Sequence, residues 1–188
     1  MLSFDVSLSL ANLQIWLLLL TSLYYWVKYT SGDDCVDALK LTALVTVSYS
    51  LTIFVHPILA KLNMLSVMYG SVFYLIYLLM DLVTLALVIR FSRKLVARAD
   101  KVSNAYVVLV LVVNSALYSL LLFELYYYFY LQDRGYSNWV VMLYQYGINT
   151  MDMMLVVALL TRKDFLGFYA MIKERRWPLV KTDTPSSS

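Results

Sequence analysis

Cysteine, histidine and charged residues are all scarce in this sequence, and each shortage excludes a class of protein. The 188 residues include one cysteine, Cys35, and one histidine, His56. A single thiol cannot form an internal disulfide, and one thiol with one histidine cannot supply the four ligands of a structural zinc site. Charged residues make up only 14% of the chain. Soluble domains carry about 25% charged residues, so composition alone indicates a membrane protein.

Catalytic signatures are also missing. The sequence contains no G-x-S-x-G, no H-E-x-x-H and no glycine-rich phosphate loop. A pair of intramembrane aspartates resembling that of an aspartyl protease is conceivable, but "TMDMML" lacks the glycine that such enzymes carry beside the second aspartate. We therefore expect a protein that is not an enzyme and that has neither a cofactor nor a nucleic-acid partner.

Apolar residues are abundant, at 62% of the chain, and they fall into five long segments. Each segment is long enough to cross a hydrocarbon core, which requires about 20 helical residues. The runs are continuous and do not alternate, which favours helices over a barrel. We predict an all-α polytopic membrane protein in which residues 1–161 form one transmembrane domain. The expected spans are residues 8–27, 39–60, 64–90, 104–130 and 138–161.

The distribution of basic residues predicts the orientation of these spans. No Lys or Arg precedes the first apolar segment and no small-x-small cleavage site follows it, so we expect a retained span and not a signal peptide. With five spans, one side of the membrane holds only Lys61 and Arg134, and the other side holds the remaining 13 of the 15 basic residues. The positive-inside rule then places the N-terminus outside and the C-terminus in the cytoplasm. The expected location is the cell membrane, either plasma or bacterial inner.

The segment after the last span has an amphipathic pattern. Phe165, Phe168 and Ile172 recur at helical spacing between basic residues, which predicts an interfacial helix over residues 162–177. The alternative is that this helix packs on the cytoplasmic ends of the bundle. Residues 178–188 are expected to be disordered. The side chains expected to contact anionic lipid headgroups on the cytoplasmic side are Arg93, Lys94, Arg98, Arg175 and Arg176.

Two aspartates interrupt the expected spans at a similar depth. A rise of 1.5 Å per residue places Asp81 about 13 Å from Arg90 along its helix, and Asp152 about 15 Å from Arg162. No Lys or Arg falls at that depth, so neither aspartate can form a salt bridge within one subunit. Transferring an unpaired, ionised carboxylate into hydrocarbon costs roughly several kcal/mol or more. Each aspartate must therefore be protonated, bind a cation or face water.

Polar residues follow both aspartates at helical spacing and predict a polar interior. We expect Asn149 to join Asp81 and Asp152 in an ion or proton site. The residues expected to line the route to that site are Tyr74, Tyr77, Thr84 and Gln145. The alternative for the amides and hydroxyls is a structural role, because such groups commonly link membrane helices through hydrogen bonds.

Two further titratable residues, His56 and Glu124, are expected near the outer ends of their spans. Both are candidates for an outer vestibule, although their interfacial depth would also let them reach water without any function. Taken together, these patterns favour a small proton or cation channel or transporter component that works through midplane carboxylates. The alternative is a non-transporting subunit or scaffold whose aspartates pair with a basic residue of a membrane partner. The small size of the chain favours a homo-oligomer or a complex with such a partner.

Overall fold

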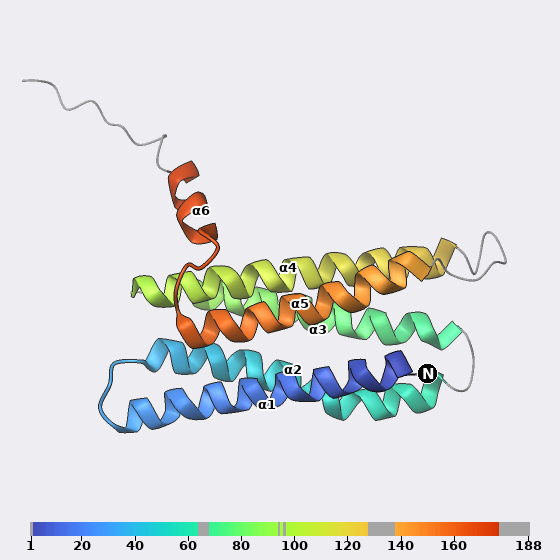
Figure 1. The fold of residues 1–188 in the computed structure, drawn as a ribbon, viewed down its shortest axis with the longest axis horizontal. Coiled ribbons are helices and arrows are strands. Elements are labelled where there is room, and N and C mark those ends of the chain that lie inside the picture. The colour runs from blue at the N-terminus through green and yellow to red at the C-terminus, as the bar shows by residue number, and fades with distance from the viewer. Residues whose placement is uncertain (1, 64–67, 94, 96, 128–137, 177–188) are drawn as a thin grey trace, which may run out of the picture.

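The computed structural model describes residues 2–63, 68–93, 95, 97–127 and 138–176. Every element within these residues is a helix, which confirms the predicted all-α class (Figure 1). The bounds are Leu2–Thr30 for α1, Val36–Asn63 for α2, Met68–Ser92 for α3, Arg98–Tyr127 for α4, Asn138–Thr161 for α5 and Phe168–Arg176 for α6. The expected tail over residues 178–188 lies outside the described part of the chain.

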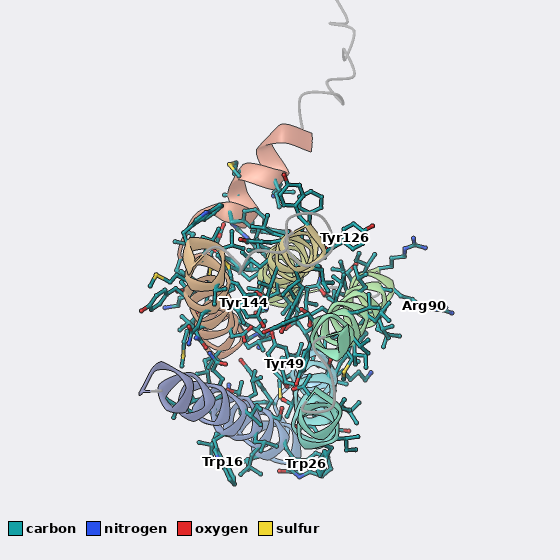
Figure 2. All side chains as sticks on the ribbon, turned by 90° about the vertical axis from the view of Figure 1, so that its right-hand side faces the viewer. Trp16, Trp26, Tyr49, Arg90, Tyr126 and Tyr144 are labelled. Atoms are coloured by element: carbon teal, nitrogen blue, oxygen red, sulfur yellow. The ribbon has the colours of Figure 1, made fainter. Side chains whose placement is uncertain are left out.

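The long helices α1 to α5 run alternately in opposite directions and form a closed ring. Each packs against its neighbour in the chain, and α1 also packs against α5, which closes the ring. Figure 2 looks along this bundle: Tyr49 and Tyr144 point into the interior, while Trp16, Trp26 and Arg90 point outward. Side chains from all five helices therefore meet in one interior.

Three of these helices are long and apolar enough to cross a membrane. The candidate spans within the described residues are Tyr74–Ser92 of α3, Arg98–Tyr127 of α4 and Trp139–Thr161 of α5. On α1, Trp16 is 65% exposed and Leu20 is 59% exposed on the outer surface of the bundle. Contiguous apolar surface of this kind is unfavourable in water and favourable against lipid. These observations support the membrane class, while the five-span topology and its orientation stay predictions.

The alternation of helix direction gathers basic residues at one end of the bundle. The C-terminal ends of α1, α3 and α5 lie there with the N-terminal ends of α2 and α4, and the N-terminus of the chain lies at the opposite end (Figure 1). We call it the basic end. Arg93 follows α3 and Arg98 begins α4, and both are exposed there. Lys94 and the side chains of Arg175 and Arg176 lie outside the described part of the chain.

The short helix α6 begins six residues later than the predicted start at residue 162. Arg162 has a φ of 52° and Gly167 a φ of 68°, and left-handed backbone at both positions separates α6 from the end of α5. The Asp164 side chain then accepts hydrogen bonds from the first free amides of the new helix. Figure 1 shows α6 lying across the direction of the long helices.

The tightest packing lies between the middle of the bundle and its basic end. Ten apolar residues, contributed by all five long helices, are between 0% and 3% exposed. We call them the apolar layer: Leu18, Leu41, Val45, Val88, Val107, Val110, Leu111, Leu155, Val156 and Leu159. On α5 this layer occupies the positions between Asp152 and Arg162, and on α3 it follows Asp81. It therefore separates Asp81 and Asp152 from the basic end.

Candidate functional site

Asp152 lies at the meeting point of three helices. Its Oδ1 atom accepts a hydrogen bond of 2.6 Å from the Tyr49 hydroxyl of α2 and one of 2.9 Å from Nδ2 of Asn114 on α4. Asn114 Nδ2 also lies 3.5 Å from the Tyr49 oxygen, so the three side chains form one network. Asp152 is only 6% exposed. The carboxylate therefore faces the interior of the bundle, where two donors are directed at one of its oxygens.

Asp81 approaches the same network from α3. It lies within electrostatic range of both Asp152 and Tyr49. Its Oδ2 atom is buried and has no hydrogen-bond partner among the described residues. No Lys or Arg in the described part of the chain forms an ion pair with either aspartate. The two carboxylates therefore lie within electrostatic range of each other in one subunit.

Asn149, the third member of the expected ion site, is engaged elsewhere. Its backbone oxygen and its Oδ1 each accept a contact of 3.4 Å from Nε2 of Gln14 on α1. Its own Nδ2 donates to the backbone oxygen of Gln145 at 2.8 Å. No hydrogen bond of the described structure joins Asn149 to Asp81 or Asp152. These contacts fasten α1 to α5.

Thr84 lies one turn from Asp81 toward the basic end and is 3% exposed. Its hydroxyl is hydrogen-bonded to Ser48 of α2 and donates to the backbone oxygen of Met80 at 2.8 Å. A side chain satisfied in this way links α2 to α3. This contact matches the structural role considered for the hydroxyl groups of the spans.

Tyr74 and Tyr77 belong to an aromatic cluster on the other side of the aspartates. Tyr77 stacks on Tyr118 of α4 with ring centroids 5.9 Å apart, and Tyr74 meets Tyr144 of α5 edge-on at 5.5 Å. Tyr118 and Tyr144 meet at 5.4 Å and their hydroxyls are hydrogen-bonded. We call these four residues the tyrosine cluster. Tyr118 lies within electrostatic range of both aspartates, so the cluster adjoins the carboxylate pair.

Asn114 and Tyr118 were missed as site residues by the sequence analysis, as was Tyr144. A signal for them existed. Asn114 is an amide inside an otherwise apolar run, Tyr118 follows it by one helical turn, and Tyr144 precedes Asp152 by eight residues on the same face of α5. Helical spacing from a known polar residue would therefore have identified them.

Of the two residues proposed for an outer vestibule, the structure describes the side chain of one. Glu124 of α4 is 6% exposed, which places its carboxyl among packed side chains. The side chain of His56 on α2 lies outside the described part of the chain. The outer vestibule therefore stays a prediction.

A second polar cluster closes the basic end of the bundle. Arg162 forms a hydrogen-bonded ion pair with Asp100 in the first turn of α4, and its guanidinium lies 5.9 Å from the ring centroid of Tyr25 on α1. The Tyr25 hydroxyl donates to the backbone oxygen of Leu159 at 2.8 Å. The Ser103 hydroxyl donates to the oxygen of Ala158 at 3.1 Å. These contacts link α1, α4 and α5 beyond the apolar layer.

Fold and site together define an all-helical protein with membrane-length apolar helices and two carboxylates within electrostatic range of each other. No family model, no curated protein and no solved structure matches this chain. The described residues also contain no group of three or more His, Cys, Asp or Glu side chains that would hold a metal ion. Function therefore rests on the geometry of the carboxylate pair.

Proposed function

We propose that this protein is a small proton or cation transporter component whose ion site is the pair Asp81 and Asp152. The observation that carries the proposal is the convergence of two carboxylates, from α3 and α5, inside a closed ring of helices. No basic side chain of the described chain neutralises them. Placing an ionised carboxylate without a counter-charge in a membrane interior costs roughly several kcal/mol. Such a pair is therefore expected where it binds a proton or an ion.

The proposal includes five membrane spans with the N-terminus outside and the C-terminus in the cytoplasm. Helices α1 and α2 have 29 and 28 residues, which is enough to cross the hydrocarbon core beside α3, α4 and α5. The outward-facing tryptophans of α1 fit a lipid-exposed surface. If only α3, α4 and α5 crossed the membrane, α1 and α2 would lie along these spans without crossing the membrane themselves. Five spans therefore fit the packing best.

Flux into proteoliposomes tests the proposal directly. Purified wild-type protein, Asp81→Asn and Asp152→Asn are reconstituted at equal density, and pH- and cation-dependent flux is measured with an entrapped indicator. We expect wild-type flux to fall at least tenfold in either variant, because the amide can neither take up a proton nor carry charge.

Asp33→Asn provides the matched control for these variants. It makes the same chemical change at an exposed aspartate of the α1–α2 connection, whose side chain is 58% exposed and pairs with Lys28. This control should keep wild-type flux. Equal flux in all four proteins would show that the carboxylate pair has no part in transport. The absence of flux in all four would show that the protein does not transport ions by itself.

A second candidate function has its own supporting observation. Asp81 is less buried than Asp152, and no described residue hydrogen-bonds its Oδ2, so a basic side chain that reached this buried atom from a partner helix would find it without a partner. In that case the protein is a subunit or scaffold of a membrane complex. Gentle solubilisation from the native membrane would then give a smaller complex for Asp81→Asn than for wild type, whereas Asp33→Asn would leave the complex intact.

A further inference from the structure

The hydrogen bonds around Asp152 are those of an ionised carboxylate. An ionised carboxylate only accepts hydrogen bonds, whereas a carboxylic acid must also donate one. Oδ1 of Asp152 receives the Tyr49 hydroxyl and the Asn114 amide. Because the Asn114 amide is also within reach of the Tyr49 oxygen, the hydrogen of the Tyr49 hydroxyl is left to point at Asp152. Two donors on one oxygen stabilise negative charge at this position.

The surroundings of Asp81 offer less support to a negative charge than those of Asp152. Its buried Oδ2 receives no donor from the described residues, so an ionised Asp81 would lack compensation for the lost hydration of that oxygen. A second negative charge would also lie near Asp152. Two carboxylates that share a site of low dielectric do not both ionise, and environments that differ in hydrogen bonding decide which one keeps the proton.

The same site is poorly built for a metal cation. Calcium, for comparison, takes about six to eight oxygen ligands, and the lone pairs of Asp152 Oδ1 already face hydrogens that would repel a cation. The titratable groups within electrostatic range of Asp81 are Tyr49 from α2, Tyr118 from α4 and Asp152 from α5, and Tyr77 precedes it by one turn on its own helix. None of them is cationic, and the apolar layer excludes hydrated ions from the basic end.

From these contacts we propose that the pair binds a single proton, which resides on Asp81, while Asp152 remains ionised and is held by Tyr49 and Asn114. The proton exchanges through the tyrosine cluster, since the apolar layer closes the other direction. This inference rests on the proposed role of the pair as the ion site. It names the transported species and assigns the two carboxylates different roles.

Infrared spectroscopy of the purified protein in lipid nanodiscs tests the protonation state without requiring transport. At neutral pH we expect the carbonyl-stretch band of a protonated carboxyl, and this band should shift when aspartate is labelled with ¹³C. The band should be lost in Asp81→Asn and retained in Asp152→Asn. Saturating Na⁺ or K⁺ at constant pH should leave it unchanged.

A conservative variant keeps the test decisive if Asp81→Asn fails to insert. Asp81→Glu retains a carboxyl, so its band should persist but no longer shift with labelled aspartate. Glu124→Gln serves as the control for a buried carboxyl outside the pair, on α4, and should leave the band in place. Asn114→Leu removes one donor from Asp152, so part of the band should move to a second position as the proton becomes shared.

Three results would overturn the proposal. A band that survives in Asp81→Asn and vanishes in Asp152→Asn would place the proton on Asp152. The absence of a labelled band at neutral pH would mean that both aspartates are ionised, and loss of the band on adding Na⁺ or K⁺ would establish a cation site. These outcomes are separate from the flux result, because a protonated Asp81 without flux contradicts transport alone.

Discussion

Asp164 shows how one carboxylate positions a whole segment at the basic end. Its Oδ1 accepts hydrogen bonds from the Tyr106 hydroxyl at 2.8 Å and the Tyr169 amide at 3.2 Å, and its Oδ2 accepts from the Ala170 amide at 2.8 Å. The Tyr106 oxygen in turn accepts from the Leu166 amide at 2.9 Å. Burial would raise the pKa of Asp164, but these donors outweigh it, so that its pKa lies below the ordinary value of 3.8.

This pKa predicts that the attachment of α6 weakens in acid. A carboxyl whose folded pKa is lowered stabilises the folded state above its ordinary pKa, and the stabilisation is lost as the pH falls through the folded value. A spin label at Met171→Cys, in a Cys35→Ala background, should therefore become more mobile below pH 3.8. Asp164→Ala should give the mobile spectrum at neutral pH, because losing a helix cap costs about 1 kcal/mol.

A label at Lys101→Cys is the control for this experiment, because Lys101 is exposed on α4 and does not contact Asp164. Its spectrum should stay constant over the same pH range. A label at position 171 that reports the same mobility for wild type and Asp164→Ala at every pH would exclude Asp164 as the cap of α6.

At the scale of elements, the apolar layer is where the helices constrain each other most. Each long helix contributes at least one member, and the layer lies between two polar clusters that are themselves hydrogen-bonded across helices. A fully buried side chain in such a layer loses its contacts outright when truncated, since neighbouring helices cannot close the gap without moving along their whole length. Packing in this layer therefore holds the ring closed.

Truncation inside the layer should destabilise the protein far more than truncation on its outer surface. Leu111 is 0% exposed and Leu20 is 59% exposed, so both can be replaced by Ala in otherwise identical proteins. We expect Leu111→Ala to lower the free energy of unfolding by about 2–5 kcal/mol. Leu20→Ala should change it by less than about 0.5 kcal/mol. Equilibrium unfolding in mixed micelles measures both, and equal losses would show that the layer is not the stabilising core.

At the level of the whole molecule, basic residues are concentrated at one end of the bundle because of the directions in which the helices run. Because α1 to α5 alternate, the basic ends of all five lie together, and the aspartate pair lies between that end and the tyrosine cluster. Inserted according to the positive-inside rule, the basic end contacts the cytoplasmic leaflet, and α6, which lies across the bundle, is oriented along the membrane surface.

Labelling from one side of the membrane tests this orientation. In a Cys35→Ala background, Asp33→Cys at the basic end should react with an impermeant thiol reagent only after the membrane is opened. Arg134→Cys, in the connection between α4 and α5, should react in sealed cells. The reverse pattern would show the opposite topology. Reaction of both variants in sealed cells would place both sites on the same side of the membrane, which contradicts three spans between them.

Much of the fold could be predicted because helix type and depth are local properties of the sequence. Long apolar runs predicted the helices, and counting residues from basic clusters predicted one depth for Asp81 and Asp152, which lie within electrostatic range of each other. The later start of α6 could not be predicted, because Arg162 adopts left-handed backbone where its side chain pairs with Asp100, a residue distant in the sequence.

The same distinction applies to the residues of the site. The sequence predicts how far along its helix, and so at which level of the bundle, each polar side chain lies, since the rise per residue of a helix is constant. Only the tertiary structure decided which groups meet at that depth: Asn114 and Tyr49 bind Asp152, whereas Asn149 binds Gln14. The rotation of each helix about its axis depends on how its side chains interdigitate with those of its neighbours, and no single helix carries that information.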